Sequence, residues 1–216
     1  MNVLIFGASG GTGKHLVRQA LTQEHNVTAF VRDAAKLDLR HDRLKLEVGN
    51  VVDYEAVESA IRGQDAIVSA LGANSPFKFD QIVVDGIMNI IKAMKKTNVE
   101  RLIYLSFIGA TESRKNAGFV IRHIAPTLLK TEIRGHALRE KMIKESDLSW
   151  TIVHAPTLTN GQRKGQYQIG ENLRATSFFV SLSRADVADF MLRQLNDNSY
   201  LNKTVRLMPL EKNADQ

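Results

Sequence analysis

Short apolar runs alternate with segments of helical periodicity along nearly the whole chain. We expect strands at the apolar or alternating runs, and helices where apolar residues recur every three or four positions. The expected strands cover residues 2–6, 27–31, 44–48, 66–71, 102–105, 150–153 and 203–208. The expected helices begin near residue 11 and cover residues 53–62, 79–96, 126–144 and 185–195, with caps expected at Asp53 and near Ser183. This alternation predicts an α/β fold, a doubly wound parallel sheet with helices on both faces.

Two of the longer helices are expected to bury apolar stripes against the sheet. The helix over residues 79–96 carries its stripe at Ile82, Val83, Gly86, Ile87, Ile90, Ile91 and Met94. The helix over residues 126–144 carries Leu129, Ile133, Ala137, Leu138 and Met142.

The polar loops over residues 115–118 and 159–170 are expected to lie on the substrate side.

The bulk composition narrows the class of protein. A length of 216 residues indicates one domain, residues 1–216, with a small C-terminal substrate-side portion. With no cysteine, the chain has no disulfide and no thiolate metal ligand, which is compatible with a cytoplasmic location. No apolar run reaches the roughly 18 residues that would span a membrane, and no signal segment or metal-ligand spacing is present. We expect a monomer or homodimer.

The formal net charge of +6 raises the question of nucleic acid. Aromatic residues do not interleave with the basic ones, so a solvated surface that favours anionic small molecules is the better interpretation. We therefore expect a small-molecule partner, and neither nucleic acid nor a membrane.

A glycine-rich segment, GASGGTG, joins the first expected strand to the first expected helix. Its glycines follow the pattern Gly7-x-x-Gly10-x-x-Gly13, which differs from the common G-x-G-x-x-G fingerprint. Glycines let the main chain approach a ligand, and the N–H groups at the start of a helix bind phosphate. A kinase-type phosphate loop does not fit, because Ala8 and His15 occupy the positions of its first glycine and its hydroxyl. The segment predicts dinucleotide binding, the alternative being a tight turn without a ligand.

Polar residues at the carboxyl ends of the expected strands extend this site, because ligands bind there in doubly wound sheets. Arg32 can clamp the 2′-phosphate of NADP. If the neighbouring Asp33 pointed inward, NAD would be preferred; we favour NADP. The alternative is a surface pair of little energetic weight. Asn50 and Val51 are expected at the adenine. The cofactor-binding residues predicted from these patterns are Gly7, Ala8, Gly10, Gly11, Gly13, Arg32, Asn50, Val51, Ala70, Leu71, Gly72, Ala73 and Ser106.

A proton donor is harder to find. The dyad Tyr-x-x-x-Lys, in which lysine lowers the tyrosine pKa, is absent from the sequence. The candidate catalytic residues are Ser106, which closes a strand, His154, which ends another, and His136. The alternative for Ser106 is a residue that simply ends its strand, and the alternative for His154 is a structural polar residue. Glu132, His136 and Glu140 share one helix face at four-residue spacing. That face could handle protons, but a solvated face is the favoured interpretation. We therefore expect the proton to come mostly from solvent.

Several segments together resemble a known family. They are GASGGTG (7–13), FVRDAAKL (30–37), VGNVVD (48–53), GQDAIVSALG (63–72), YLSFIGA (104–110), SDLSWTIVHAPTLTNG (146–161) and SRADVADFMLRQL (183–195). The set resembles the atypical short-chain dehydrogenase/reductases, and in particular the NmrA-like, NAD(P)H-binding branch that includes biliverdin reductase B (flavin reductase). The resemblance implies a Rossmann-type sheet that binds NADPH, with further contacts at Ser9 and Thr12 and nicotinamide contacts near Ala155 and Pro156. It also implies reduction of flavins, quinones or tetrapyrroles without the Tyr/Lys dyad.

The chain also departs from the family pattern. Asn50 stands where many relatives have Asp, Phe107 stands at the second position of the usual serine pair, and Thr157 replaces the histidine of biliverdin reductase B. The substrate of that relative therefore cannot be carried over.

The prediction is an NADPH-dependent reductase that passes hydride to a planar conjugated acceptor, a flavin or a quinone, stacked on the nicotinamide. Its apolar walls are expected at Phe77, Phe107, Phe119 and Phe178. One alternative is a non-catalytic NADP-binding sensor of NmrA type. Another is an epimerase or dehydratase of nucleotide-linked sugars.

Overall fold

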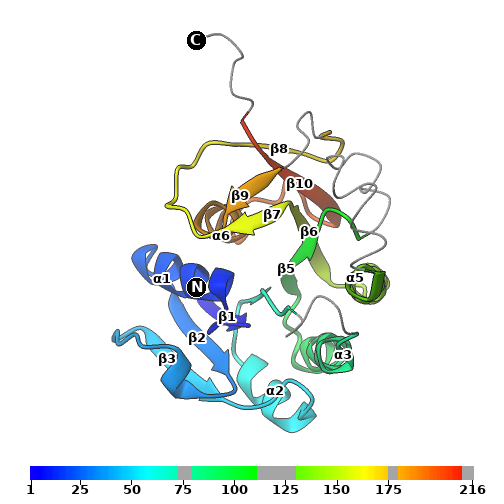
Figure 1. The fold of residues 1–216 in the computed structure, drawn as a ribbon. Helices are drawn as coiled ribbons and strands as arrows, with labels where there is room; N and C mark the ends of the chain where they lie inside the picture. Colours follow the sequence, from blue (N-terminus) through cyan, green and yellow to red (C-terminus); the bar gives the residue numbers. More distant parts are fainter. Residues whose placement is uncertain (73–78, 111–129, 175–179, 211–216) are drawn as a thin grey trace.

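The computed structural model describes residues 1–72, 79–110, 130–174 and 180–210. Its main sheet has eight strands in the order β3-β2-β1-β4-β5-β6-β10-β8 (Figure 1). Neighbouring strands from β3 to β10 are parallel, and β8 pairs antiparallel with β10 at the edge. The strands are β1 (Asn2–Phe6), β2 (Asn26–Val31), β3 (Leu44–Val48), β4 (Ala66–Ser69), β5 (Arg101–Phe107), β6 (Ser149–Ala155), β8 (Tyr167–Gly170) and β10 (Lys203–Pro209). The predicted Rossmann-type doubly wound sheet is confirmed.

The first strand shows why its sequence is continuously apolar. Val3 and Ile5 belong to one core cluster, whereas Leu4 and Phe6 belong to the cluster on the opposite face. All four side chains are fully buried. A parallel strand with helices on both faces has no solvated side, so both sets of alternating residues must be apolar.

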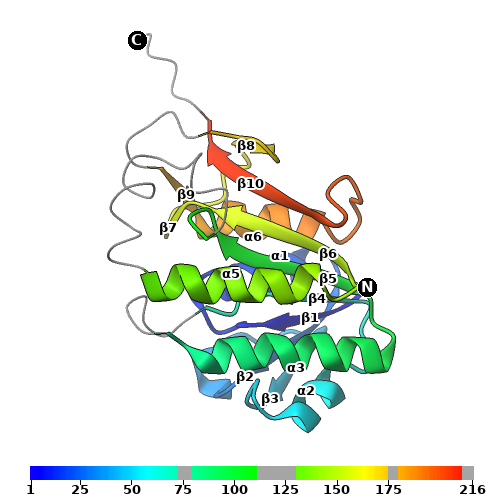
Figure 2. The ribbon, with the colours of Figure 1, turned by 90° about the vertical axis from the view of Figure 1, so that its right-hand side faces the viewer.

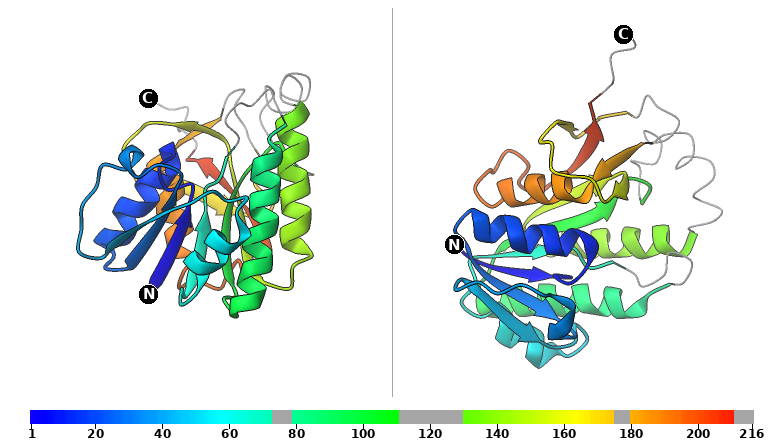
Figure 3. Two further views of the ribbon diagram at one scale, coloured as in Figure 1. Left: turned by 90° about the horizontal axis from the view of Figure 1, so that it is seen from below. Right: turned by 60° about the vertical axis from the view of Figure 1, so that its left-hand side comes forward.

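Helices cover both faces of the sheet. On one face α1 (Gly11–Thr22) and α6 (Arg184–Arg193) pack side by side, as the right-hand view of Figure 3 shows. On the other face lie α2 (Tyr54–Ile61), α3 (Gln81–Thr97) and α5 (Lys130–Lys144), with α3 against α5 (Figure 2). Asp53 and Ser183 cap α2 and α6 as expected. No helix in the described part of the chain combines the length and hydropathy that a bilayer crossing requires.

Several short elements were not predicted. A 3-10 helix, η1, covers Ala34–Lys36. The strands β7 (Thr157–Thr159) and β9 (Ser181–Ser183) form a separate parallel pair. The predicted loop over residues 159–170 contains β8, which pairs with the end of β10. Elements of three or four residues carry too little periodicity to be recognised, and pairing with distant strands decides them.

The stripe predicted for α5 is the main error in the fold. Leu138 is 39% exposed, and the buried residues of α5 are Gly135, Arg139, Glu140 and Ile143. Residues 126–129, with Leu129, lie outside the described part of the chain. In α3, by contrast, most of the predicted stripe is buried, although Ile82 is 44% exposed. Ile143 adds apolar surface to the buried face of α5, but Glu140 makes this face partly polar because groups on β5 and β6 bond to it, as described below.

Candidate functional site

A cleft of about 780 Å³ lies along the carboxyl ends of the parallel strands. This volume falls within the roughly 300–1,000 Å³ that is usual for ligand sites. Most of the predicted cofactor residues line it: Gly7, Ser9, Gly10, Gly11, Thr12, Arg32, Val51, Ala70, Leu71, Gly72, Ser106, Ala155 and Pro156. Ala8, Gly13 and Asn50 do not line it. Ala73 lies outside the described residues.

The glycine turn has the tight geometry that its sequence predicted. Gly7 has φ of +74°, and a Cβ built there would lie 2.6 Å from the carbonyl oxygen of Ala70. A Cβ on Gly13 would lie 2.0 Å from the carbonyl oxygen of Gly7, so Gly13 serves the close packing of α1 on β1. No side chain caps α1 at Gly10. Its first-turn N–H groups are therefore left to a ligand or to water, at the positive end of the helix dipole.

Two of the predicted cofactor contacts do not line the cleft and have local structural roles. Ala8 is fully buried in the core beneath the turn. The Asn50 side chain accepts a hydrogen bond from the backbone N–H of Val52 at 3.3 Å, a local turn that keeps this oxygen on its own loop. Val51 lies at the cleft as predicted, and packs against Gly86 of α3.

Arg184, the first residue of α6, was missed in the sequence. It lines the cleft, and its Nε would lie 2.7 Å from a Cβ built on Gly11, so it covers the glycine turn directly. Its guanidinium donates to the Asn160 side chain at 2.7 Å. The only sequence signal was the predicted cap near Ser183, which places Arg184 at the start of a helix.

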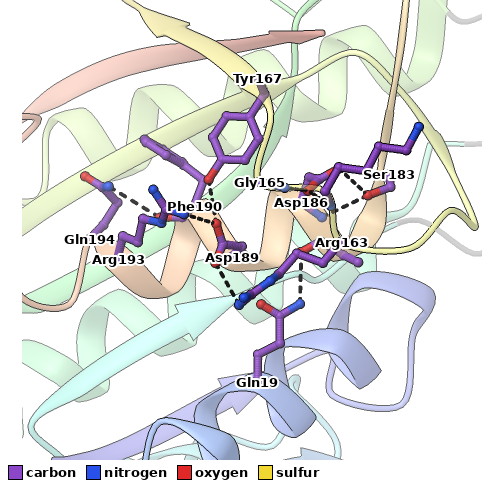
Figure 4. Close-up of polar contacts among 12 residues, drawn as sticks. Gln19, Arg163, Gly165, Tyr167, Ser183, Asp186, Asp189, Phe190, Arg193 and Gln194 are labelled. Carbon is purple, nitrogen blue, oxygen red and sulfur yellow. Dashed lines mark hydrogen bonds and ion pairs between the residues drawn. The ribbon is translucent and has the colours of Figure 1, made fainter. Parts of the chain in front are cut away.

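Two aspartates of α6 anchor the segment between β7 and β8 (Figure 4). Asp186 Oδ1 accepts from the backbone N–H groups of Lys164 at 2.7 Å and Gly165 at 2.8 Å. Asp189 accepts from the Tyr167 hydroxyl at 2.8 Å. Burial, together with Asp189, raises the pKa of Tyr167 above its usual value. These buried bonds hold the segment that carries Asn160, and with it the partner of Arg184, against α6.

The end of the cleft beside β2 is cationic. Arg32 and Lys36 both line it, and Lys36 was not predicted. The Asp33 side chain makes a local contact: it accepts a hydrogen bond from the backbone N–H of Ala35 and caps η1. The carboxylate that made the choice between NADP and NAD ambiguous is therefore engaged as a cap.

The opposite end of the cleft contains polar side chains on β5 and α5 that are buried or mostly buried. Ser106 and His136 line the cleft, as do Glu132 and the predicted apolar wall residue Phe107. The other predicted wall residues, Phe77, Phe119 and Phe178, lie outside the described part of the chain. Ser106 is 4% exposed, and the side chains of Glu132 and His136 are 15% and 12% exposed. The favoured prediction of a solvated helix face is therefore wrong.

These side chains form one connected set. Glu132 Oε1 lies 3.0 Å from His136 Nε2, and His136 Nδ1 lies 3.0 Å from Ser106 Oγ. Ser106 Oγ lies 2.6 Å from Glu140 Oε1, which is 2.8 Å from His154 Nε2. Two cations border the set, since Arg139 is 3.3 Å from Glu132 and Lys144 is 3.5 Å from Glu140.

His154 differs from the other two candidate catalytic residues. It is fully buried and does not line the cleft. Its contact with the site runs through Glu140, so the structure brings it into the set of polar residues but not to a ligand. Strand pairing explains this, because His154 lies beside Ser106 in the register of β5 and β6.

The environment shifts the pKa values within the set. Burial favours the neutral form of Glu140, yet hydrogen bonds from His154 and Ser106 outweigh it and lower the pKa of this carboxyl. Glu132 behaves in the same way, because burial is outweighed by its contacts with His136 and Arg139, and its pKa is lowered. Burial lowers the pKa of His136, although the hydrogen bond with Glu132 opposes this. Both carboxylates are therefore ionised near neutral pH.

Comparison with known proteins places this geometry in a family. The family described as NAD(P)H-binding matches residues 7–198. The photosystem II assembly factor Ycf39 of Synechocystis sp. is 25% identical over 217 residues, which cover 94% of this chain and 61% of that protein. The chain thus spans about three fifths of that relative's length.

Solved structures share the fold. An anaerobillin reductase, ChuY, of Escherichia coli O157:H7 superposes with a TM-score of 0.82 at 22% identity, covering 98% of each chain. A short-chain dehydrogenase/reductase of Veillonella parvula in complex with NADP gives a TM-score of 0.77 at 19% identity, covering 95% of this chain and 93% of that one. With the family match spanning the glycine turn, the cleft and α6, this chain belongs to the NAD(P)H-binding family of Rossmann-fold proteins.

Proposed function

We propose that the protein is an NADPH-dependent oxidoreductase that transfers hydride to a planar conjugated acceptor, a flavin or a quinone. The observation that carries this proposal is one cleft with cationic side chains at one end, bare main-chain amides in the middle and buried polar groups at the other end. When bound, the nicotinamide supplies the hydride, and the protein orients the reactants and excludes water.

The cleft residues divide into contacts for each part of the dinucleotide. The turn from Gly7 to Gly13 and the Arg184 guanidinium would hold the pyrophosphate. Arg32 and Lys36 would hold the 2′-phosphate, and Val51 would pack on the adenine. The remaining contacts, near the ribose and the nicotinamide, are Ala70, Leu71, Gly72, Ser106, Ala155 and Pro156.

The acceptor would occupy the part of the cleft beside β5, β6 and α5. Phe107 and Ile133 supply apolar surface there, together with Leu158 of β7. Such walls favour a flat, weakly polar ring system, with a small number of polar groups to fix its orientation.

Calorimetry with NADPH and NADH tests the cofactor. We expect Arg32→Ala to weaken NADPH binding by about 10-fold or more, because a hydrogen bond to a charged group contributes roughly 1.5–3 kcal/mol. NADH binding should change little, because NADH lacks the 2′-phosphate. Arg40→Ala, an exposed arginine that does not line the cleft, is the matched control. Equal losses for both nucleotides would contradict the NADP assignment, and no heat with either would overturn nucleotide binding altogether.

A second candidate function is a non-catalytic NADP-binding regulator. It is favoured by the likeness to Ycf39, which is described as an assembly factor, and by the missing Tyr-x-x-x-Lys dyad. The same missing dyad argues against the sugar epimerase alternative. Turnover separates the two leading candidates: steady NADPH oxidation with FMN or a quinone supports the reductase. Nucleotide binding without oxidation by any acceptor tested would support the regulator.

A further inference from the structure

The polar set at the acceptor end allows its hydrogens to be assigned from geometry. Glu140 is ionised near neutral pH and can only accept. Ser106 Oγ, at 2.6 Å, must therefore donate its hydrogen to Glu140 Oε1. Because that hydroxyl has one hydrogen, its contact with His136 at 3.0 Å requires a hydrogen on His136 Nδ1. The neutral imidazole is thereby fixed as the Nδ1–H tautomer.

The other imidazole nitrogen then faces a group that cannot donate to it. His136 Nε2 lies 3.0 Å from Glu132 Oε1, and an ionised carboxylate only accepts. A hydrogen bond at this contact requires a second hydrogen on the ring. The position between Nε2 and Glu132 is therefore where the site takes up and releases a proton, and both residues line the cleft.

We propose that His136 is the proton donor to the acceptor and that Ser106, Glu140 and His154 are positioning residues that fix its tautomer. This inference rests on the proposed function. The acceptor receives hydride from the reduced nucleotide and a proton from His136 Nε2, which completes its two-electron reduction. The ring is left neutral as the Nδ1–H tautomer, and water then restores the Nε2 proton beside the partly exposed Glu132.

The surroundings make the His136 proton easy to release. The charged and titratable neighbours are Glu132, Arg139 and Glu140 on α5, Ser106 on β5 and His154 on β6, and Asp80 at the start of α3 lines the same cleft. Burial, together with the positive charge of Arg139, outweighs the opposing effect of Glu132 and Glu140 and lowers the pKa of His136. The donor form therefore becomes more populated as the pH falls below neutrality, and the proton-dependent rate should rise in that direction.

Histidine NMR on the protein without nucleotide tests the positioning chain. With ¹⁵N-labelled histidine, the wild type should show His136 as the Nδ1–H tautomer above its pKa, assigned by loss of its signals in His136→Gln or by through-bond correlation. Glu140→Gln should give a mixture of tautomers, because its amide can donate to Ser106. Glu145→Gln, an exposed glutamate just beyond α5, should leave the tautomer unchanged. An Nε2–H tautomer in the wild type, or no change in Glu140→Gln, would overturn the proposal.

Kinetics with NADPH and the working acceptor test the donor itself. His136→Gln should lower kcat by about 100-fold or more, the usual contribution of a general acid, with the Kd for NADPH nearly unchanged. Glu132→Gln should move the pH limb of kcat to lower pH, because it removes the charge that favours the imidazolium. His41→Gln, an exposed histidine away from the cleft, should match the wild type. Unchanged kcat and pH profile in His136→Gln would refute the donor, whereas a wild type with the expected tautomer but no NADPH oxidation would refute the proposed function instead.

Discussion

Helices α3 and α5 lie side by side on the same face of one sheet, yet they bury opposite kinds of surface (Figure 2). The buried residues of α3 are almost all apolar, among them Ile87, Ile90 and Met94. Those of α5 include Arg139 and Glu140, which are 1% and 0% exposed. The two helices occupy equivalent positions in the fold, so architecture does not explain the difference.

The contrast shows that the buried face of α3 contributes to stability, whereas the buried polar groups of α5 need another explanation. An apolar face needs only volume and shape to be favourable. A buried polar face is costly unless every group finds a partner, and a chain with such a face gains nothing in stability over an apolar one. The burial of Glu140 supports the positioning role proposed above for Ser106, Glu140 and His154, because clusters of buried titratable groups beside a cleft are typical of functional sites.

The largest effect is expected on the apolar side of this comparison. Ile87→Ala should lower the free energy of unfolding by about 2–5 kcal/mol, since it leaves a cavity in a fully buried position. Urea denaturation measures this, and the His136 tautomer should be unaffected at temperatures where the variant is folded. Met88→Ala, one residue along and 51% exposed, should be nearly neutral. If the two variants lost equal stability, α3 would not face the sheet as described.

A smaller effect with a pH signature is expected on the polar side. Glu140→Gln should cost about 1–3 kcal/mol at pH 7, because Ser106 and His154 lose a charged acceptor. The folded pKa of Glu140 lies below its usual value of 4.5, so its contribution is complete above that pH and disappears as the pH falls through the lowered pKa. Urea denaturation should therefore show a difference in the free energy of unfolding between variant and wild type at neutral pH. At acid pH this difference should disappear. A difference that persisted at acid pH would show that packing, not charge, holds Glu140.

The smallest effect is expected at the outer face of α5. Leu138→Gln should change stability by no more than about 0.5 kcal/mol, because this side chain is 39% exposed and surface substitutions are usually near neutral. Thermal unfolding with the wild type as reference is a sufficient measurement. A loss of several kcal/mol would support the apolar stripe first expected for this helix. It would contradict the packing of the polar set against the sheet.

The first strand, the glycine turn and the first helix could be predicted from the sequence because their signals are local. A buried strand, a glycine turn and a helix start follow one another within residues 2–22, so the whole pattern can be recognised in one short stretch of sequence. The same holds for Asp53, whose cap on α2 is made within three residues. The position of Arg184 could not be predicted in this way, because its contact with Gly11 joins residues from opposite ends of the sequence.

Period and composition were sufficient for the α/β class, the glycine turn and the edge of the sheet where a nucleotide would bind, because each follows from contacts between near neighbours in the chain. Tertiary structure alone decided that α5 turns its glutamates and histidine inward, that Asp33 becomes a cap and that His154 lies beneath the cleft. Each of these depends on partners that residue spacing cannot reveal, since the free energy of burying a polar group changes sign with the presence of a partner.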